Sequence, residues 1–425
     1  MAVAADAART PAAAMRVPSK WYLPTVFLGV PLWWLLGVEA FVWPLFALPL
    51  AVALVGRRER LARPPVFGVW LLFLLWAGLS ATQLPSLNRA LAFGYRGSMY
   101  LAATVFLLYV LNASRRAFPT ALAVNVMVGL AALVVAGGYL GLLLPDVRFG
   151  SLAQHLVPAE LRHTPFIADA VRVDFAGKAW VGHSQTRPTA PFRYANEWGS
   201  TLALLVPFVL LALSEARTRL RQGLLSALLV AAVVPVLATV NRGVWLALML
   251  ALVYVAVRFA VAGRLRPVAY AGAFIAAAVA ISVLSGFGAG AGSRVQADNS
   301  THARRVLYEE ASRKAASSPL LGYGAPSHSA PDGLPAVGTH GQFFLVLVSQ
   351  GIPGLLFFSA FFAYSAVRFR GLDPPLVFWA HVGLLIFFVE SLYYELLPLQ
   401  LLLVMVLLGL AWREIRHADA PAGSR

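Results

Sequence analysis

The sequence predicts an all-α polytopic membrane protein with about twelve transmembrane helices and a helical cap formed by two long loops. First, 60% of its 425 residues are hydrophobic and only 12% are charged, so one soluble core could not bury its apolar surface. Second, apolar runs of about 17–25 residues, long enough to cross the hydrocarbon core of a bilayer, recur along nearly the whole chain. Third, every second short connection is basic.

Pro, Gly and charged clusters divide the apolar runs. The first twenty residues lack the apolar stretch and cleavage site of a signal peptide, so we expect the first hydrophobic segment to remain in the membrane. Its pairing with the second, equally short segment is also compatible with a hairpin. The predicted spans are 21–36, 39–55, 65–81, 95–111, 119–144, 196–214, 222–240, 243–262, 267–285, 341–367, 374–391 and 395–412.

The distribution of basic residues predicts the orientation. Alternate short connections contain Arg57–Arg63, Arg115–Arg116, Arg217–Arg221, Arg258–Arg266 and Arg368–Arg370, whereas 37–38 and 392–394 contain no Lys or Arg. Because cytoplasmic connections carry the excess of Lys and Arg, we expect a multi-pass inner-membrane protein with both termini in the cytoplasm.

Two long connections then fall on the external, periplasmic side. Loops of this length in a compact protein are usually functional or disordered, and their aromatic residues, prolines and helix-like stretch favour a folded cap. The predicted organisation is helices 1–5 in 1–144, the first long loop in 145–195, helices 6–9 in 196–285, the second long loop in 286–340, and helices 10–12 with a cytoplasmic tail in 341–425.

Composition excludes several chemistries. The chain has no cysteine, which rules out disulfides, thiolate metal sites and thiol nucleophiles. We find no metal-binding pattern, because the spacing of His302, His328 and Asp298 is not diagnostic, and no Gly-rich phosphate loop for ATP. The net charge of +16 is explained by membrane topology without nucleic acid.

The most informative stretch of the second loop runs from Ser300 to Gly324. Ser300 and Thr301 are suited to cap a helix that extends to about residue 316, and Pro319 with Gly322 would end it. Arg305 is spaced by four from Glu309, as in an ordinary surface ion pair. Arg304 lies on another face of this helix, with no acidic residue at helical spacing. Its guanidinium group is therefore better suited to an anionic ligand, which it can bind bidentately.

His340 lies where the second loop returns to the membrane. Imidazole is the side chain whose unperturbed pKa suits proton transfer near neutral pH. Most loop histidines are only solvated, so position alone does not assign this one a role.

Arginines also occur at other external boundaries. Arg242 lies between two apolar spans, where an arginine is costly and usually has a partner or a function; its alternative is snorkelling to lipid headgroups. Arg187, Arg193 and Asn196 precede another span, where an interfacial belt of Tyr, Trp and Arg is the alternative. Together these arginines lie on the same side as His340, and such a set could capture a pyrophosphate.

Four blocks carry a family resemblance. Arg187 to Asn196 is similar to Arg-x-x-Gly-x-Phe-x-x-x-Asn, with Ala190 at the glycine position, and Asn241-Arg242-Gly243 followed by Trp245 is similar to Ser-Arg-Gly-x-Trp. In this order and spacing, with the two blocks that follow, they resemble the O-antigen ligase and polymerase superfamily of bacterial membrane glycosyltransferases.

The other two blocks lie in the second loop and the helix after it. Arg304, Tyr308 and residues 319–324 are similar to Arg-x-x-x-Trp followed by Pro-Leu-x-Gly-x-Gly, with Tyr in place of Trp. His340 and the glycines after it are similar to His-Asn-x-x-Leu followed by Glu-x-Gly-x-x-Gly, although Gly341 replaces the Asn and Gln350 the Glu.

The resemblance implies a GT-C-like fold and transfer of O-antigen polysaccharide from undecaprenyl diphosphate to a sugar hydroxyl of lipid A-core oligosaccharide. It implies that His340 is the general base and that the diphosphate is bound by Arg187, Arg193, Arg242 and Arg304. Arg305, Asn196 and Tyr308 are secondary candidates. It also implies inversion at the anomeric carbon and no metal, nucleotide or other cofactor.

Other functions stay open. An O-antigen polymerase would use glycan-lipid as donor and acceptor, and a protein O-oligosaccharyltransferase would use a protein acceptor. A transporter of an anionic solute would bury charges at mid-span, and Glu390 and Glu395 near a span end keep that interpretation open.

Overall fold

A computed structural model describes residues 20–56, 61–116, 118–162, 165–178, 186–284, 299–327, 336–371 and 373–418. Helices account for most of these residues. The helices of the membrane bundle are α1 (Tyr22–Leu28), α2 (Val30–Leu35), α3 (Val42–Val55), α4 (Phe67–Leu79) with the 3₁₀ turn η2 (Ser80–Gln83), α5 (Leu87–Asn112), α6 (Thr120–Leu143), α10 (Ala195–Ser214), α11 (Arg219–Ala238), α12 (Arg242–Val261), α13 (Leu265–Leu284), α16 (Gln342–Arg368), α17 (Pro375–Ser391) and α18 (Leu399–Ala418).

The described helices confirm a polytopic membrane protein. Seven of them, α5, α6, α10, α11, α12, α13 and α16, are long and apolar enough to cross a membrane, and α3, α4 with η2, and α17 are shorter apolar helices. Each predicted span coincides with a helix or with a pair of consecutive helices. Two boundaries differ clearly: the first span is broken at Gly29 into α1 and α2, and α5 begins at Leu87 instead of residue 95.

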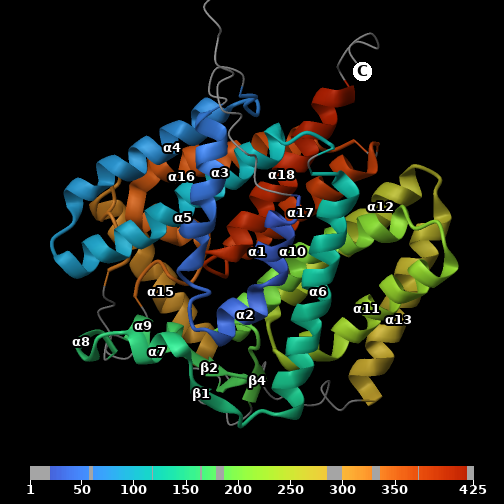
Figure 1. Ribbon diagram of the computed structural model, residues 1–425, viewed down its shortest axis with the longest axis horizontal. Coiled ribbons are helices and arrows are strands. Elements are labelled where there is room, and N and C mark those ends of the chain that lie inside the picture. The colour runs from blue at the N-terminus through green and yellow to red at the C-terminus, as the bar shows by residue number, and fades with distance from the viewer. Residues whose placement is uncertain are drawn as a thin grey trace, which may run out of the picture.

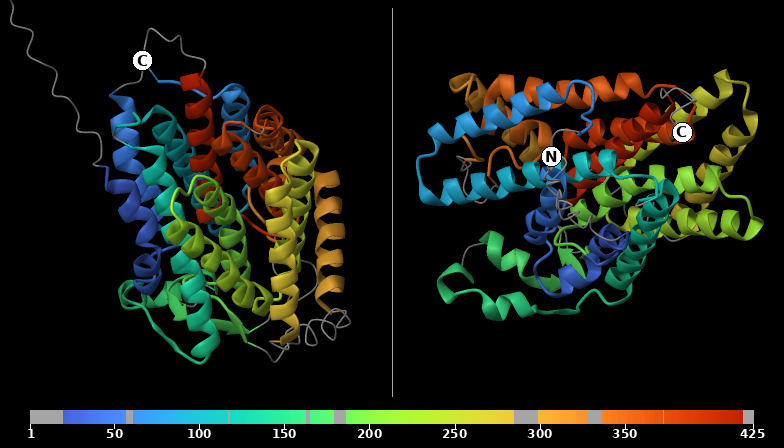
Figure 2. Two further views of the ribbon diagram at one scale, coloured as in Figure 1. Left: turned by 90° about the vertical axis from the view of Figure 1, so that its right-hand side faces the viewer. Right: turned by 45° about the horizontal axis from the view of Figure 1, so that its top comes forward.

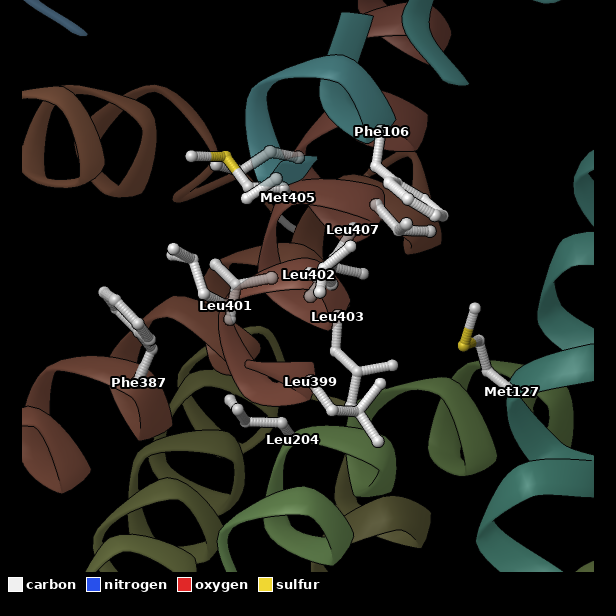
Figure 3. Packing of buried hydrophobic residues seen from close by; sticks show 14 of the residues in the cluster. Phe106, Met127, Leu204, Phe387, Leu399, Leu401, Leu402, Leu403, Met405 and Leu407 are labelled. Carbon is white, nitrogen blue, oxygen red and sulfur yellow. The ribbon is translucent and has the colours of Figure 1, made fainter. Parts of the chain in front are cut away.

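The last helix, α18, forms the centre of the bundle. Its residues 399–413 are all buried, and it packs against α5, α17 and α10. Figure 3 shows the side chains of Leu399 and Leu403 next to each other with Leu204 of α10 nearby, and Leu407 beside Phe106 of α5. Around this axis, α11, α12 and α13 lie on one side and α4, α5 and α16 on the other (Figures 1 and 2). The bundle is therefore built around a helix that is apolar from Leu401 to Trp412, between the buried polar residues Gln400 and Arg413.

The two long loops gather at one end of the bundle, opposite the end where α18 terminates (Figure 1). We call this the loop end. The described residues of the first loop form three short helices and four short strands: β1 (Arg148–Gly150), α7 (Leu152–Leu156), α8 (Ala159–Arg162), α9 (Pro165–Ala170), β2 (Arg172–Asp174), β3 (Ala176–Lys178) and β4 (Thr186–Pro188). Strand β1 pairs antiparallel with β2, and β3 with β4. This part of the cap is thus mixed, not helical throughout as predicted.

The second loop forms the predicted helix, α15 (Asn299–Ser317), which ends within one residue of the predicted end but begins earlier than predicted. Ser300 and Thr301 lie inside this helix and do not precede it, so the predicted capping position is wrong. α15 packs against α16, and it brings Arg304 to the loop end.

A backbone clamp joins the end of α15 to the middle of α16. Tyr323 N donates to Val348 O at 2.9 Å, and Ile352 N donates to Pro319 O at 2.7 Å. Gly351 interrupts α16 with a positive φ of 70°, and a Cβ atom there would lie 2.3 Å from Leu320 O. Only glycine combines this φ with so close an approach of two backbones. The glycine motif of the sequence therefore fixes α15 relative to the start of α16.

Candidate functional site

His340 lies in the turn before α16, half-buried at the loop end. Its Nδ1 atom is 3.4 Å from Thr339 Oγ1, and the Thr339 hydroxyl donates to Ala336 O at 2.8 Å. Since that hydroxyl proton points to Ala336, the contact favours Nδ1–H as donor and a basic Nε2. Burial, and then the nearby positive charge of Arg304, lower the pKa of His340 to about 4. The imidazole is thus neutral at pH 7.

Arg304 comes to His340 from α15 and rests on an aromatic ring. Its guanidinium carbon lies 5.7 Å from the centroid of the Tyr394 ring, within the range of a cation–π interaction. A ring holds the guanidinium group without cancelling its charge. Arg304 and His340 were both singled out in the sequence, and the structure brings them within electrostatic range of each other.

Tyr394 also connects this pair to the turn before α12. Its hydroxyl donates to Asn241 Oδ1 and accepts from the Gly243 N–H group at 2.9 Å. Arg242, half-buried, stands between these two residues as the first residue of α12. The Arg242 backbone is therefore tied to the same tyrosine that holds Arg304.

Arg187 and Asn196 join this group from the other side of the turn. Arg187 Nε donates to Thr239 O, and its Nη2 atom lies 3.3 Å from Asn196 Oδ1. Asn241 Nδ2 donates to Ala195 O at 3.3 Å. Backbone and amide oxygens, which are neutral acceptors, thus orient Arg187. We call the connected set the arginine–histidine site; it comprises Arg187, Asn196, Asn241, Arg242, Arg304, His340 and Tyr394.

Arg193 has different neighbours. Its Nη2 atom is 2.7 Å from Glu197 Oε1, in a pair whose side chains are only 7% and 11% exposed. It also interacts electrostatically with Glu39 and Tyr95. Burial and the nearby Glu197 raise the pKa of Glu39, which is itself buried. The structure therefore places Arg193 in a buried ionic group, and its predicted role as a diphosphate ligand stays a prediction.

A second ion pair belongs to this group. Arg96 of α5 pairs with Glu395 at 3.0 Å, and Tyr95 lies within electrostatic range of Arg193, Glu39, Glu197 and Glu395. We call Glu39, Arg96, Arg193, Glu197 and Glu395 the paired cluster. The sequence analysis noted Glu395 only as a charge near a span end, and it did not single out Arg96 or Glu39.

The two remaining candidates on α15, Arg305 and Tyr308, differ in their contacts. Arg305 is exposed and pairs with Glu309 at 2.8 Å, as the spacing of four predicted. Tyr308 lies beside His340: its hydroxyl is 3.0 Å from Leu392 O and 3.4 Å from the backbone oxygen of His340, and its ring stacks on Phe344 with centroids 4.4 Å apart. Tyr308 thus fastens α15 to the segment after α17 and to α16.

Glu390, at the end of α17, is completely buried, and neither of its carboxyl oxygens has a hydrogen-bond partner among the described residues. It lies within electrostatic range of Tyr394. Asp298, His328 and the side chain of His302 lie outside the described residues. Within the described residues, no group of three or more His, Asp or Glu side chains is arranged to hold a metal ion.

Residues 227–359 match the family model described as O-antigen ligase. The match includes Arg242, Arg304 and His340, but not the segment from Arg187 to Asn196. No curated protein matches the chain.

Proposed function

We propose that this chain, a member of the O-antigen ligase superfamily, transfers O-antigen polysaccharide from undecaprenyl diphosphate to a sugar hydroxyl of lipid A-core oligosaccharide. The reaction takes place at the periplasmic face of the bacterial inner membrane, with both termini of the chain in the cytoplasm. The two long loops, 145–195 and 286–340, form the periplasmic cap. The observation that carries the proposal is that Arg304 lies within electrostatic range of His340 and over the ring of Tyr394, whose hydroxyl accepts from Gly243 N–H in the turn of Arg242.

The reaction requires a general base for the acceptor hydroxyl and positive charge that stabilises the diphosphate leaving group. His340 takes the proton of the acceptor hydroxyl, whose oxygen forms a bond to the anomeric carbon of the donor glycan. The bond from that carbon to the diphosphate oxygen breaks, and undecaprenyl diphosphate leaves with the electron pair. Direct displacement inverts the anomeric centre. Arg187, Arg242 and Arg304 stabilise the negative charge on the leaving group, so the proposed reaction is independent of a metal.

The two parts of the site support each other. In the free protein the charge of Arg304 and burial keep His340 neutral but weakly basic. A bound diphosphate offsets the charge of Arg304, which raises the basicity of the imidazole. Donor binding therefore prepares His340 for the acceptor.

The proposal is tested in cells that lack any other ligase. Cells producing His340→Ala or Arg242→Ala at the protein level of the unmodified chain should make lipopolysaccharide without attached O-antigen. Full-length capped lipopolysaccharide from both variants would contradict the proposal.

The acceptor is tested with purified protein. Glycan-loaded undecaprenyl diphosphate is supplied with lipid A-core, with unpolymerised glycan-lipid, or with an acceptor protein. Product only with lipid A-core supports a ligase. Product only with glycan-lipid would indicate a polymerase, and product only with protein would indicate a protein O-oligosaccharyltransferase.

A further inference from the structure

The connection between α17 and α18 contributes one residue to the arginine–histidine site. Its central residue, Tyr394, is 3% exposed. Tyr394 lies between Tyr393 and Glu395, 54 residues after His340, and it belongs to none of the four blocks that carry the family resemblance. In the structure it contacts three segments that are far apart in the chain.

The hydroxyl of Tyr394 organises the turn before α12. It is donor to Asn241 Oδ1 and acceptor for Gly243 N–H at once. A Cβ atom at Gly243 would lie 2.5 Å from this hydroxyl oxygen, so glycine is required for the approach. The conformation of the backbone on either side of Arg242 thus depends on one hydroxyl group.

The ring of Tyr394 carries Arg304, whose guanidinium carbon is 5.7 Å from the ring centroid. The other described contacts of α15 nearby, through Tyr308, hold the helix but not the Arg304 side chain. Since arginine has a long flexible side chain, a ring beneath it reduces the number of conformations that it samples.

The backbone around Tyr394 fixes the segment that bears His340. Tyr394 O accepts from Gln342 N at 2.7 Å, and a Cβ atom at Gly341 would lie 2.8 Å from Leu392 O. The start of α16, immediately after His340, is therefore docked on the same short connection.

We propose that Tyr394 is a positioning residue that sets the mutual arrangement of Arg242, Arg304 and His340 for glycosyl transfer. This inference rests on the proposed function. A tyrosine that only filled space could be replaced by phenylalanine without consequence. Here loss of the hydroxyl leaves the buried Asn241 and Gly243 groups without their partner, and such groups rearrange to recover a hydrogen bond.

The test compares Tyr394→Phe, which keeps the ring, with Tyr394→Leu, which removes it. Both are purified and assayed for kcat and for the donor KM per folded molecule, and for binding of undecaprenyl diphosphate without turnover. We expect Tyr394→Phe to lower kcat roughly 10- to 100-fold, as for a misplaced catalytic array. Tyr394→Leu should in addition weaken undecaprenyl diphosphate binding, because Arg304 loses its support.

Tyr393→Phe is the matched control. It removes a hydroxyl one position away that has no hydrogen bond among the described residues, and its kcat should equal that of the unmodified chain. In undecaprenyl diphosphate binding, the loss in the double variant Tyr394→Leu/Arg304→Gln should be smaller than the sum of the two single losses, because both substitutions act in part on the Arg304 guanidinium group.

Two results overturn the inference. One is unchanged kcat and KM in Tyr394→Phe with only a lower melting temperature, since this is the result expected of a structural tyrosine. The other is full additivity of the double variant. If the unmodified chain transfers glycan to no acceptor, the proposed function fails instead. The role of Tyr394 is then tested by undecaprenyl diphosphate binding alone, and unchanged binding in Tyr394→Leu would overturn the inference.

Discussion

The loop end of the bundle contains two groups of arginines that differ in what holds them. In the paired cluster, carboxylates hold Arg193 and Arg96 at 2.7 and 3.0 Å. In the arginine–histidine site, Thr239 O and Asn196 Oδ1 hold Arg187, and the ring of Tyr394 holds Arg304. All are arginines near the same membrane boundary, but their surroundings suit them to different work.

The difference follows from charge compensation. A carboxylate cancels most of the field of a guanidinium group, which makes burial tolerable and locks two helices together. A carbonyl oxygen or an aromatic face fixes the guanidinium group but leaves its positive charge available to an anion. The paired cluster is therefore suited to hold the scaffold, and the arginine–histidine site to bind a diphosphate.

The largest expected effect tests the paired cluster. Arg193→Gln leaves the buried Glu197 carboxylate without its cation and should reduce the free energy of unfolding by about 3–5 kcal/mol. Thermal unfolding in detergent measures the loss. Arg193→Gln combined with Glu197→Gln should recover much of it. If the double variant is stable but binds undecaprenyl diphosphate poorly, Arg193 is a ligand and the division between the two groups is wrong.

The next effect contrasts two neighbours on α15. Arg304→Gln should reduce transfer roughly 10²- to 10³-fold at unchanged protein level, which is typical for loss of a group that stabilises developing negative charge. Arg305→Gln removes only an exposed pair with Glu309 and should change the rate less than about twofold. Initial rates with purified protein decide between them. Equal losses would show that α15 contributes general positive charge and not one positioned guanidinium group.

The sequence was sufficient for features that depend on local spacing. Apolar run length predicted the membrane helices, and the spacing of four predicted the Arg305–Glu309 pair, because both signals lie within a few helical turns. The strands β1–β4 escaped prediction because three residues are too few for an alternating pattern. The early start of α5 was missed because Asn88 and Arg89 in its first turn resemble a polar loop.

Features that depend on distant partners were out of reach. Arg96 and Glu395 are 299 residues apart, and Tyr394 is 151 residues from Gly243. No local sequence pattern distinguishes Tyr394 or Glu395 from other residues. Arg193 and Glu197, by contrast, are only four residues apart, so local spacing could have indicated their pair, but Arg193 was interpreted only as part of a motif.

The pH dependence of transfer offers a smaller effect. A base must be neutral to act, so kcat/KM should fall as the pH drops through the pKa of His340, about 4 in the free protein. Burial is the larger cause of this low value and Arg304 the smaller. In Arg304→Gln the pH below which kcat/KM falls (the acidic limb) should therefore move up, but it should stay below the pKa of a solvated histidine. Rates between pH 4 and 7 measure the shift, and Arg305→Gln should leave the limb in place.

The smallest expected effect concerns the orientation of the His340 ring. Thr339→Val keeps the shape of the side chain but removes the oxygen 3.4 Å from Nδ1. One neutral hydrogen bond contributes about 0.5–1.5 kcal/mol, so kcat should fall roughly 2- to 13-fold, and Thr339→Ser should restore it. Because the described side-chain hydrogen bonds of Thr339 go to Ala336 O and His340 Nδ1, undecaprenyl diphosphate affinity should stay constant. A loss of affinity without a loss of kcat would mean that residue 339 shapes the anion site, and that the imidazole takes its tautomer from another contact.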